Sequence, residues 1–257
     1  MRVERTIRAL IVLAVLISSL ELTAIDSEAS CPTTAGGTLS TDQVVDNMVA
    51  RNQERAQALL HTEATRVYRL VYHGLRSDLA AEMTVQASYE RPSSKKFKVV
   101  SQSGSKLIAN HVFKRLLESE EEAAQPAMSA KTQLNRDNYD FVLMGYEPSA
   151  VGGQYVLRVA PKVRGKYVYR GRIWVDGVDF AVTQIEAEPA ENPSFWTKKS
   201  EIHHEYRKIQ GFWLPVKNQS VSYIRLGGRA TLTIEYQDYS VIDARQPRAA
   251  RNTRATN

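Results

Sequence analysis

Hydrophobic and polar residues alternate along much of this chain, and strict alternation is typical of a β-strand with one buried and one solvated face. The clearest case runs over 79–90, where Met83 belongs to the apolar face and Glu82 to the polar face. Further strand patterns over 65–73 and 95–101 flank it across short turns. The three segments therefore predict an antiparallel meander.

Two other segments have a helical period. Ser40 and Gln43 have the spacing of a capping box, and the apolar residues that follow predict a helix over 41–60. A second apolar stripe at helical spacing predicts a helix over 106–125, which Pro126 would end.

The second predicted helix carries an acidic run near its C-terminal end. Carboxylates in that position oppose the helix dipole, so we expect the run to mark a solvated end of the helix. The run consists of Glu118, Glu120, Glu121 and Glu122.

Strand patterns resume after this helical interruption and continue almost to the C-terminus. Glycine-containing pairs that tolerate positive φ separate most of them, as tight turns require. Together with the meander they predict about ten antiparallel strands, near the size at which a sheet curls toward a barrel. The later strands are expected over 139–146, 154–160, 167–176, 180–188, 199–208, 212–224 and 229–239.

Two irregularities favour a barrel that does not close. The apolar phase moves from Phe180 and Val182 to Ile185 and Ala187, as a β-bulge would produce. Pro215 lies inside a predicted strand and indicates a sheet edge or an interrupted ladder. The expected fold is mainly β with α: a curved antiparallel sheet forming an unclosed β-barrel, covered by the N-terminal helix and the second, inserted helix.

Residues 1–29 have the three parts of a secretory signal peptide, with cleavage expected after Ala29 and cleavage after Ala24 as the less favoured alternative. The apolar run is shorter than the roughly 20 residues that span a bilayer. The single cysteine, Cys31, follows at once, so no internal disulfide is expected. Cys31 would suit a lipid anchor, although Glu28 stands where lipoprotein signals have an aliphatic residue.

Composition predicts one globular domain between polar ends. The apolar fraction of 43% is ordinary for a globular protein. After the signal we expect a leader over 30–39, a single domain over 40–241 and a disordered basic tail over 242–257, which has too few apolar residues to order itself. The tail contributes to the formal net charge of +6 and would attract anionic lipid headgroups weakly. Nucleic acid is not an expected partner of an exported protein.

One polar cluster has residue types that could form a metal or catalytic site. Glu201, His203 and Glu205 share a strand face and could ligate a metal or act in acid–base catalysis. Arg207 shares that face, and a solvated strand face is the interpretation we favour. No serine stands in a nucleophile elbow and no Gly-rich phosphate loop is present in the sequence. We expect no catalytic residues, no metal and no cofactor, with a hydrolase as the weakest alternative.

The order of these elements resembles the periplasmic outer-membrane lipoprotein-sorting family, the LolA-like fold. Residues 39–48 are similar to the opening helix of that family, 172–176 to its central strand ending in Asp, and 211–215 to its late strand that begins after Gly and reaches Pro. The resemblance covers 39–239. It implies a periplasmic, monomeric and non-enzymatic carrier or chaperone whose apolar concave face, covered by helices, holds acyl chains of a lipoprotein or lipid.

The resemblance leaves an alternative, a periplasmic sensor of the same fold that binds a lipid or lipoprotein and signals to a membrane partner. Inner- and outer-membrane proteins are the partners that either function implies. The expected cavity residues come from inward strand faces and the second helix, and ordinary core packing is the alternative for each. They are Met83, Val85, Tyr89, Phe97, Val99, Ile108, Val112, Leu116, Tyr155, Leu157, Tyr169, Ile173, Val175, Leu232 and Ile234.

Overall fold

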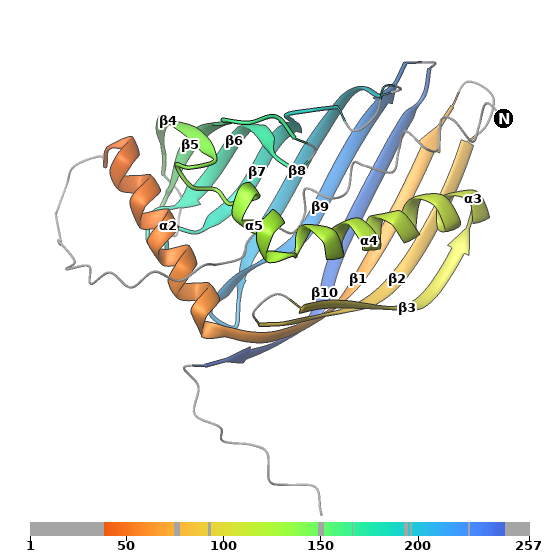
Figure 1. Ribbon diagram of the computed structural model, residues 1–257, viewed down its shortest axis with the longest axis horizontal. Helices are drawn as coiled ribbons and strands as arrows, with labels where there is room; N and C mark the ends of the chain where they lie inside the picture. Colours follow the sequence, from red (N-terminus) through yellow and green to blue (C-terminus); the bar gives the residue numbers. More distant parts are fainter. Residues whose placement is uncertain are drawn as a thin grey trace, which may run out of the picture.

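The computed structural model describes residues 39–244 with short gaps at 75–77, 92–93, 149–151, 166, 193–194, 196 and 226. The expected signal peptide, the leader up to residue 38 with Cys31, and the tail from residue 245 lie outside the described residues. Figure 1 shows one long, curved sheet with helices across its concave face.

The sheet contains ten strands in the order β3-β2-β1-β10-β9-β8-β7-β6-β5-β4, and every neighbouring pair is antiparallel. Since β3 and β4 stand at opposite ends of this order, the sheet is curved but not closed, which confirms the predicted fold class. The strands are β1 (Leu59–His73), β2 (Asp78–Glu90), β3 (Ser94–Gly104), β4 (Tyr139–Glu147), β5 (Gln154–Pro161), β6 (Tyr169–Asp176), β7 (Val182–Pro189), β8 (Thr197–Ile209), β9 (Phe212–Ile224) and β10 (Arg229–Asp243).

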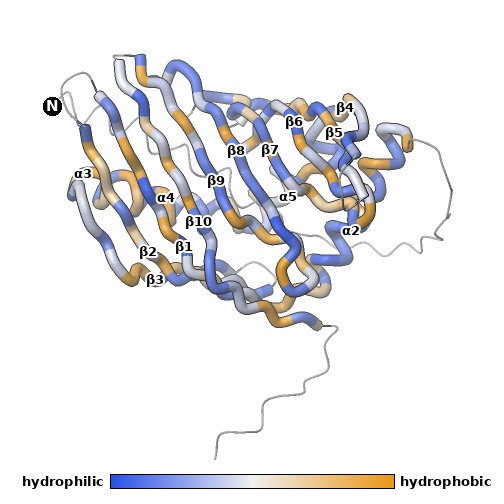
Figure 2. Tube along the Cα trace, turned by 180° about the vertical axis from the view of Figure 1, so that it is seen from behind, coloured by the Kyte–Doolittle hydropathy of each residue, from blue (hydrophilic) through white to orange (hydrophobic). Residues whose placement is uncertain are grey.

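Alternation along the strands sets which side chains face inward. In β2, Met83 and Val85 are buried on the concave side, while Glu82 and Gln86 are exposed. Figure 2, the view from behind, shows hydrophobic and hydrophilic residues alternating along the strands. The alternation that predicted the strands therefore also separates the two faces of the sheet.

The first helix, α2 (Thr41–Ala58), begins as the sequence predicts and ends two residues early. Its capping box is present: Gln43 N donates to Ser40 Oγ at 3.2 Å, and Ser40 N donates to Gln43 Oε1 at 2.9 Å. The buried face, with Val44, Val45 and Met48, packs on β5, β6, β7 and β8. We call this packed region the α2 core.

The second helical segment crosses β1, β2 and β10 and contains a π-helical turn. It consists of α3 (Lys106–Ile108), η2 (Ala109–Phe113), α4 (Lys114–Ala123) and, after a turn, α5 (Pro126–Thr132). The wider turn lets the adjacent residues Val112 and Phe113 both face the sheet. The helix predicted over 106–125 ends at Ala123, and Pro126 begins the next helix, because proline suits the first helical position.

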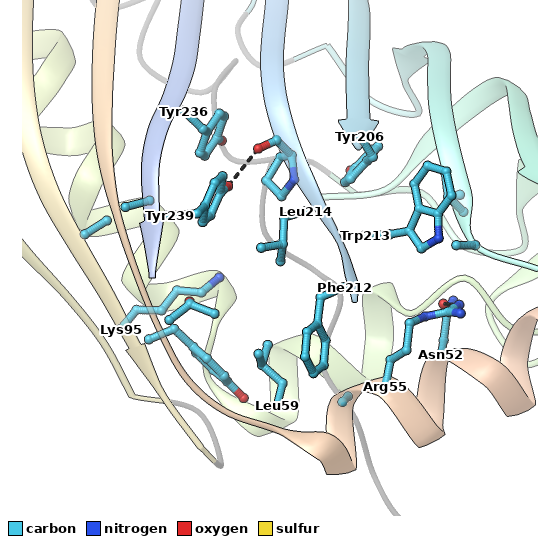
Figure 3. Close-up of a pocket in the computed structure, with 18 of the residues that line it drawn as sticks. Asn52, Arg55, Leu59, Lys95, Tyr206, Phe212, Trp213, Leu214, Tyr236 and Tyr239 are labelled. Atoms are coloured by element: carbon cyan, nitrogen blue, oxygen red, sulfur yellow. Dashed lines mark hydrogen bonds between the residues drawn. The ribbon is translucent and has the colours of Figure 1, made fainter. Parts of the chain in front are cut away.

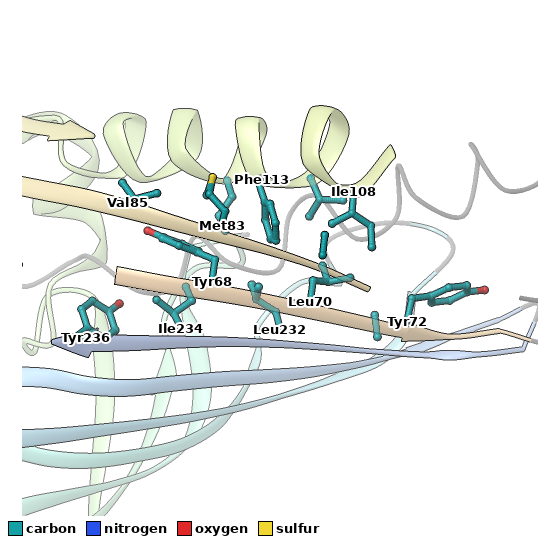
Figure 4. Packing of buried hydrophobic residues seen from close by; sticks show 14 of the residues in the cluster. Tyr68, Leu70, Tyr72, Met83, Val85, Ile108, Phe113, Leu232, Ile234 and Tyr236 are labelled. Atoms are coloured by element: carbon teal, nitrogen blue, oxygen red, sulfur yellow. The ribbon is translucent and has the colours of Figure 1, made fainter. Parts of the chain in front are cut away.

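The second helical segment and the strands beneath it form a second core, which we call the lid core. Figure 4 shows Ile108 pointing down toward Leu70, and Phe113 pointing down beside Met83 and Tyr68. The apolar face of the helical segment therefore has a partner along β1, β2 and β10.

Both predicted irregularities are present. Val175 pairs with Val182 and Trp174 with Gln184, so Thr183 is the extra residue of a bulge in β7. β9 is an inner strand of the sheet, but at Pro215 it pairs only with β8, so the expected edge is present locally. The expected interruption of the ladder is also confirmed, since the register between β8 and β9 shifts next to Pro215.

Candidate functional site

The sheet parts between β9 and β10. These strands pair from Lys217 and Glu235 to Tyr223 and Arg229, and beyond Lys217 each keeps only its other neighbour. Proline offers no N–H to a ladder, which is consistent with the break beside Pro215. We call the parted segments, 212–216 of β9 and 237–241 of β10, the β9–β10 seam.

On the β10 side of the seam, a second bulge bends the strand. Two residues, Asp238 and Tyr239, oppose the single Ala64 of β1, and Asp238 adopts a positive φ of 52°. The Tyr239 hydroxyl reaches across and donates to the carbonyl of Pro215 at 2.7 Å (Figure 3). A side chain thus bridges the strands where the backbone ladder ends.

Beneath the seam, the side chains leave a cavity of about 180 Å³. An apolar cavity of about 150 Å³ is large enough to hold benzene, so this one has room for a short alkyl segment. The lining residues come from α2, from the strands of both cores and from the chain after α5. They are Asn52, Arg55, Ala56, Leu59, Thr62, Ala64, Arg66, Ala87, Ser88, Tyr89, Lys95, Thr132, Leu134, Tyr167, Tyr169, Ala181, Val182, Ile185, Tyr206, Phe212, Trp213, Leu214, Pro215, Tyr236 and Tyr239.

Aromatic and apolar residues dominate this wall, and its charged residues have one sign. Figure 3 shows Phe212, Leu214 and Leu59 between the cationic side chains of Arg55 and Lys95. Among the described residues that line the cavity, none is an aspartate or a glutamate. The cavity wall is therefore mainly apolar, and the charged side chains at its margins are cations.

Arg55 fixes the end of α2 against the turn between β6 and β7. Its guanidinium donates to the carbonyls of Asp179 at 2.8 Å and Phe180 at 3.3 Å, and to Asn52 Oδ1 at 2.6 Å. Burial lowers the pKa of Arg55, and nearby Asp179 partly offsets that effect. The group remains a cation at neutral pH, held by backbone acceptors.

Arg66 joins the cavity wall to the second helical segment. Its Nη1 lies 2.6 Å from Glu120 Oε2, and Tyr68 donates to Glu120 Oε1 at 3.1 Å. The Arg66 guanidinium also lies over the rings of Phe97 and Tyr236, at 5.3 and 5.0 Å from their centroids. Burial alone would lower the pKa of Arg66, but Tyr68 and Glu120 raise it above its ordinary value, so the pair is ionic.

This contact corrects the expectation for the acidic run. Glu120 is 0% exposed and points into the protein, so the run does not mark a wholly solvated helix end. Glu122 is exposed but accepts a hydrogen bond from the Tyr167 hydroxyl at 2.7 Å, while Glu118 lies on the outer side, 3.9 Å from Lys114. Two of the four carboxylates thus tie α4 to β1 and to the connection before β6.

The polar face of β8 lies on the outer side of the sheet. His203 is partly exposed and lies 3.1 Å from Glu205 Oε1 and 3.8 Å from Glu186 Oε1, with Glu201 exposed nearby. On the opposite face His204 is buried, and burial lowers its pKa to about 3, so its ring is neutral. Within the described ranges, no three acidic, histidine or cysteine side chains are grouped to hold a metal ion.

The predicted cavity residues fall into three places, and contact with a guest stays a prediction for each. Tyr89 and Tyr169 line the cavity at the seam. Met83, Phe97 and Val99 line a second hollow, of about 520 Å³, between β2, β3 and the second helical segment. The rest are packed in the lid core (Val85, Ile108, Val112, Leu116, Leu232 and Ile234) or in the α2 core (Tyr155, Leu157, Ile173 and Val175).

The two hollows differ in how well they could shelter a chain. The second lies at the sheet edge, where Val99 is 48% exposed, and Lys114, Glu118 and Glu121 form part of its rim. The cavity at the seam lies between the two cores and has the more aromatic wall. We therefore place the candidate site at the seam.

Sequence reasoning missed most of the wall at the seam, including Tyr206, Phe212, Leu214 and Tyr239. One signal in the sequence indicated this region: Pro215 inside a predicted strand predicts an interrupted ladder. The sequence did not show that the interruption separates two strands.

No protein-family model and no curated protein matches this sequence. Solved structures with a similar fold include a DUF1329 family protein from Desulfovibrio piger, with 14% identity, a TM-score of 0.42, and coverage of 79% of this chain and 94% of that chain. A putative outer membrane lipoprotein-sorting protein domain from Vibrio parahaemolyticus has 11% identity, a TM-score of 0.40, and coverage of 79% and 93%. A LolA superfamily protein from Nitrosomonas europaea has 10% identity, a TM-score of 0.35, and coverage of 79% and 94%.

The second and third of these are described as lipoprotein-sorting and LolA superfamily proteins, the family that the sequence resembles. At such low identities and TM-scores, these similarities do not indicate which residues form the site. A search of the described helices for a membrane-spanning segment finds none with the required length and apolar character.

Proposed function

We propose that this protein is an exported, periplasmic and non-enzymatic carrier that shelters an alkyl chain of a lipid or lipoprotein in the cavity at the β9–β10 seam. The observation that carries the proposal is the cavity of about 180 Å³, walled largely by aromatic and apolar side chains between the two cores. Each methylene transferred from water into such a place contributes about 0.8 kcal/mol. The secretory character of residues 1–29 supports export.

A full acyl chain requires more room than the cavity has, so the second helical segment must shift to admit one. Polar links hold that segment over the cavity, notably Glu120 to Arg66 and Glu122 to Tyr167. The short α5, of seven residues, lies between these links and Leu134 in the wall. The apolar face with Ile108 and Phe113 would stay packed in the lid core, and the part that shifts would be α5, whose buried residues are polar.

Tryptophan fluorescence tests the proposal directly, because Trp213 lines the cavity and donates to Asp179 Oδ2 at 2.8 Å. The chain has three tryptophans, so Trp174→Phe with Trp196→Phe leaves Trp213 as the sole reporter. Bromododecanol, whose bromine quenches an indole on contact, is expected to quench this variant saturably. The control keeps Trp174 alone, on the outer face beside Glu147, and should show no saturable quenching.

A blocking variant gives a second readout. Leu214→Trp fills the cavity, since Leu214 is buried and lines it, and should abolish saturable binding of the neutral probe N-phenylnaphthylamine. Leu107→Trp makes the same change at an exposed site of α3 and should bind as wild type does. Absence of quenching at Trp213, or normal binding by Leu214→Trp, would contradict the carrier function at this site.

A further inference from the structure

The charged groups of the cavity wall are all hydrogen-bond donors. Its charged members, Arg55, Arg66 and Lys95, are cations, and no carboxylate stands among the described lining residues. A carboxylate accepts hydrogen bonds, whereas guanidinium and ammonium groups only donate them. The wall therefore presents donors and positive charge to whatever occupies the cavity.

Two tyrosines on the wall have hydroxyls without a protein partner. Tyr169 on β6 and Tyr206 on β8 both line the cavity, and no group in the described part of the chain hydrogen-bonds to either hydroxyl. Their neighbours differ: Tyr239 donates to the carbonyl of Pro215, and Asn218 donates to the hydroxyl of Tyr236 at 2.7 Å. Neither hydroxyl is among the fully buried polar atoms that lack a partner, so both can be reached from the cavity and can donate to an acceptor there.

The charge state of these phenols keeps them donors. Burial raises the pKa of Tyr206, and burial together with the neighbouring Tyr139 and Tyr206 raises the pKa of Tyr169. Both hydroxyls therefore carry their protons at any pH that a periplasm reaches. Both side chains line the same cavity.

Arg66 adds an incompletely satisfied cation on the same wall. Its Nη1 is paired with Glu120, but its Nε is buried and has no partner among the described groups. The Arg66 charge also acts on Tyr239 across the cavity, where burial has the larger influence on the pKa of that tyrosine. Arg66 and Tyr206 both line the cavity, so an anion there would share it with this guanidinium, whose charge Glu120 already pairs.

We propose that the cavity selects an amphiphile with one alkyl chain and an anionic, acceptor-rich head, a carboxylate or a phosphate, and that the head accepts hydrogen bonds from Tyr169 and Tyr206. This inference rests on the proposed carrier function and narrows its ligand class. A cationic head would meet the like charges of Arg55 and Lys95, and a hydroxyl head would accept the donated hydrogen bonds without the added strength of a negative charge.

The test is a competition series at one chain length. Laurate, dodecyl phosphate, dodecanol and dodecyltrimethylammonium each displace N-phenylnaphthylamine from the wild-type protein below their micellar concentrations. At least one of the two anions should bind about tenfold more tightly than dodecanol, the ratio that one charge-assisted hydrogen bond supplies. The order of laurate and dodecyl phosphate identifies whether the head is a carboxylate or a phosphate.

The variant Tyr169→Phe/Tyr206→Phe keeps both rings and removes both hydroxyls. It should bring the affinity for the preferred anion down to that for dodecanol and leave dodecanol unchanged. Tyr72→Phe is the matched control, because Tyr72 is a buried tyrosine of the lid core that does not line the cavity. The single variant Tyr206→Phe, with an intermediate effect expected, serves if the double variant does not fold.

The outcomes separate the two proposals. If dodecanol or the cationic detergent binds as tightly as both anions, the selectivity for an anionic head is wrong while the carrier function stands. If the variant without the hydroxyls retains the full preference for anions, the role of Tyr169 and Tyr206 is wrong. If none of the four compounds displaces the probe, both proposals fail.

Discussion

At one end of the concave face the buried polar groups are charged and paired, whereas at the other end a buried histidine is neutral. The lid core meets the Arg66–Glu120 pair, with 2.6 Å between Nη1 and Oε2. On the side of β8 that faces the α2 core lies His204, whose Nδ1 has no partner among the described residues. The buried polar groups are therefore stabilised in different ways: by an ion pair at one end and by loss of the charge at the other.

The difference indicates which cover of the sheet can move. The α2 helix is docked by Val44, Val45 and Met48, each 0% exposed, so lifting it would expose apolar surface. The second helical segment also has an apolar face, but its α4 end is held by an ion pair and a tyrosine hydrogen bond. Polar links are specific in geometry and can be replaced by a guest, which suits a lid.

Removing half of the ion pair should have the largest effect on stability. Glu120→Ala leaves Arg66 charged and buried, and the expected decrease in the free energy of unfolding is about 3–5 kcal/mol. Urea unfolding followed by circular dichroism measures it. The exposed Glu118→Ala should change stability by less than about 0.5 kcal/mol.

A double variant sharpens the same comparison. Replacing both partners, as Arg66→Met with Glu120→Leu, should restore most of the stability, because a buried pair often contributes little beyond an apolar substitute. If Glu120→Ala unfolds within about 1 kcal/mol of wild type, the pair does not hold the lid in solution.

The buried histidine predicts a pH dependence of intermediate size. Its pKa is about 3 in the folded protein, below the ordinary 6.5, so the unfolded chain binds the proton more readily. Stability is then complete above about pH 6.5 and decreases as pH falls toward the folded pKa. Between about pH 7 and 4.5 the wild type should lose about 2–3 kcal/mol through this residue.

The control is His204→Leu, which removes the titrating ring and should unfold with a flatter pH profile over the same interval. Chemical denaturation of both proteins across that interval measures the difference in slope. Parallel profiles would mean that His204 is hydrated or paired in solution.

The fold was largely predictable because its signals are local. Alternation over 79–90 and the capping box at Ser40 depend on neighbouring residues, and both elements occur where they were expected. The start of β1 at Leu59 was missed, since that part of the strand is stabilised by pairing with β10, far along the chain. Long-range pairing leaves little trace in a local pattern.

The site was less predictable because it is a cavity left between the lid core and the α2 core, whose residues lie far apart in the sequence. In the sequence Glu120 has the pattern of a solvated helix residue. In the structure it pairs with Arg66, which lies 54 positions earlier in the chain. Inward positions such as Leu157 and Tyr169 look alike in sequence, yet one is packed in the α2 core and the other also lines the cavity. Only the parting of β9 from β10 distinguishes them.

The smallest effect is expected at the seam itself. Tyr239→Phe removes the hydrogen bond to the carbonyl of Pro215 and should lower the free energy of unfolding by about 1 kcal/mol. Tyr223→Phe, at a partly exposed position where β9 and β10 are still paired, should be neutral. Because the Tyr239 hydroxyl bridges strands that lack a backbone ladder, its loss should also speed amide exchange in β10 near the seam more than in the paired half. Equal acceleration in both halves would show that the seam is no weaker than the rest of the sheet, and an opening there would lose its structural basis.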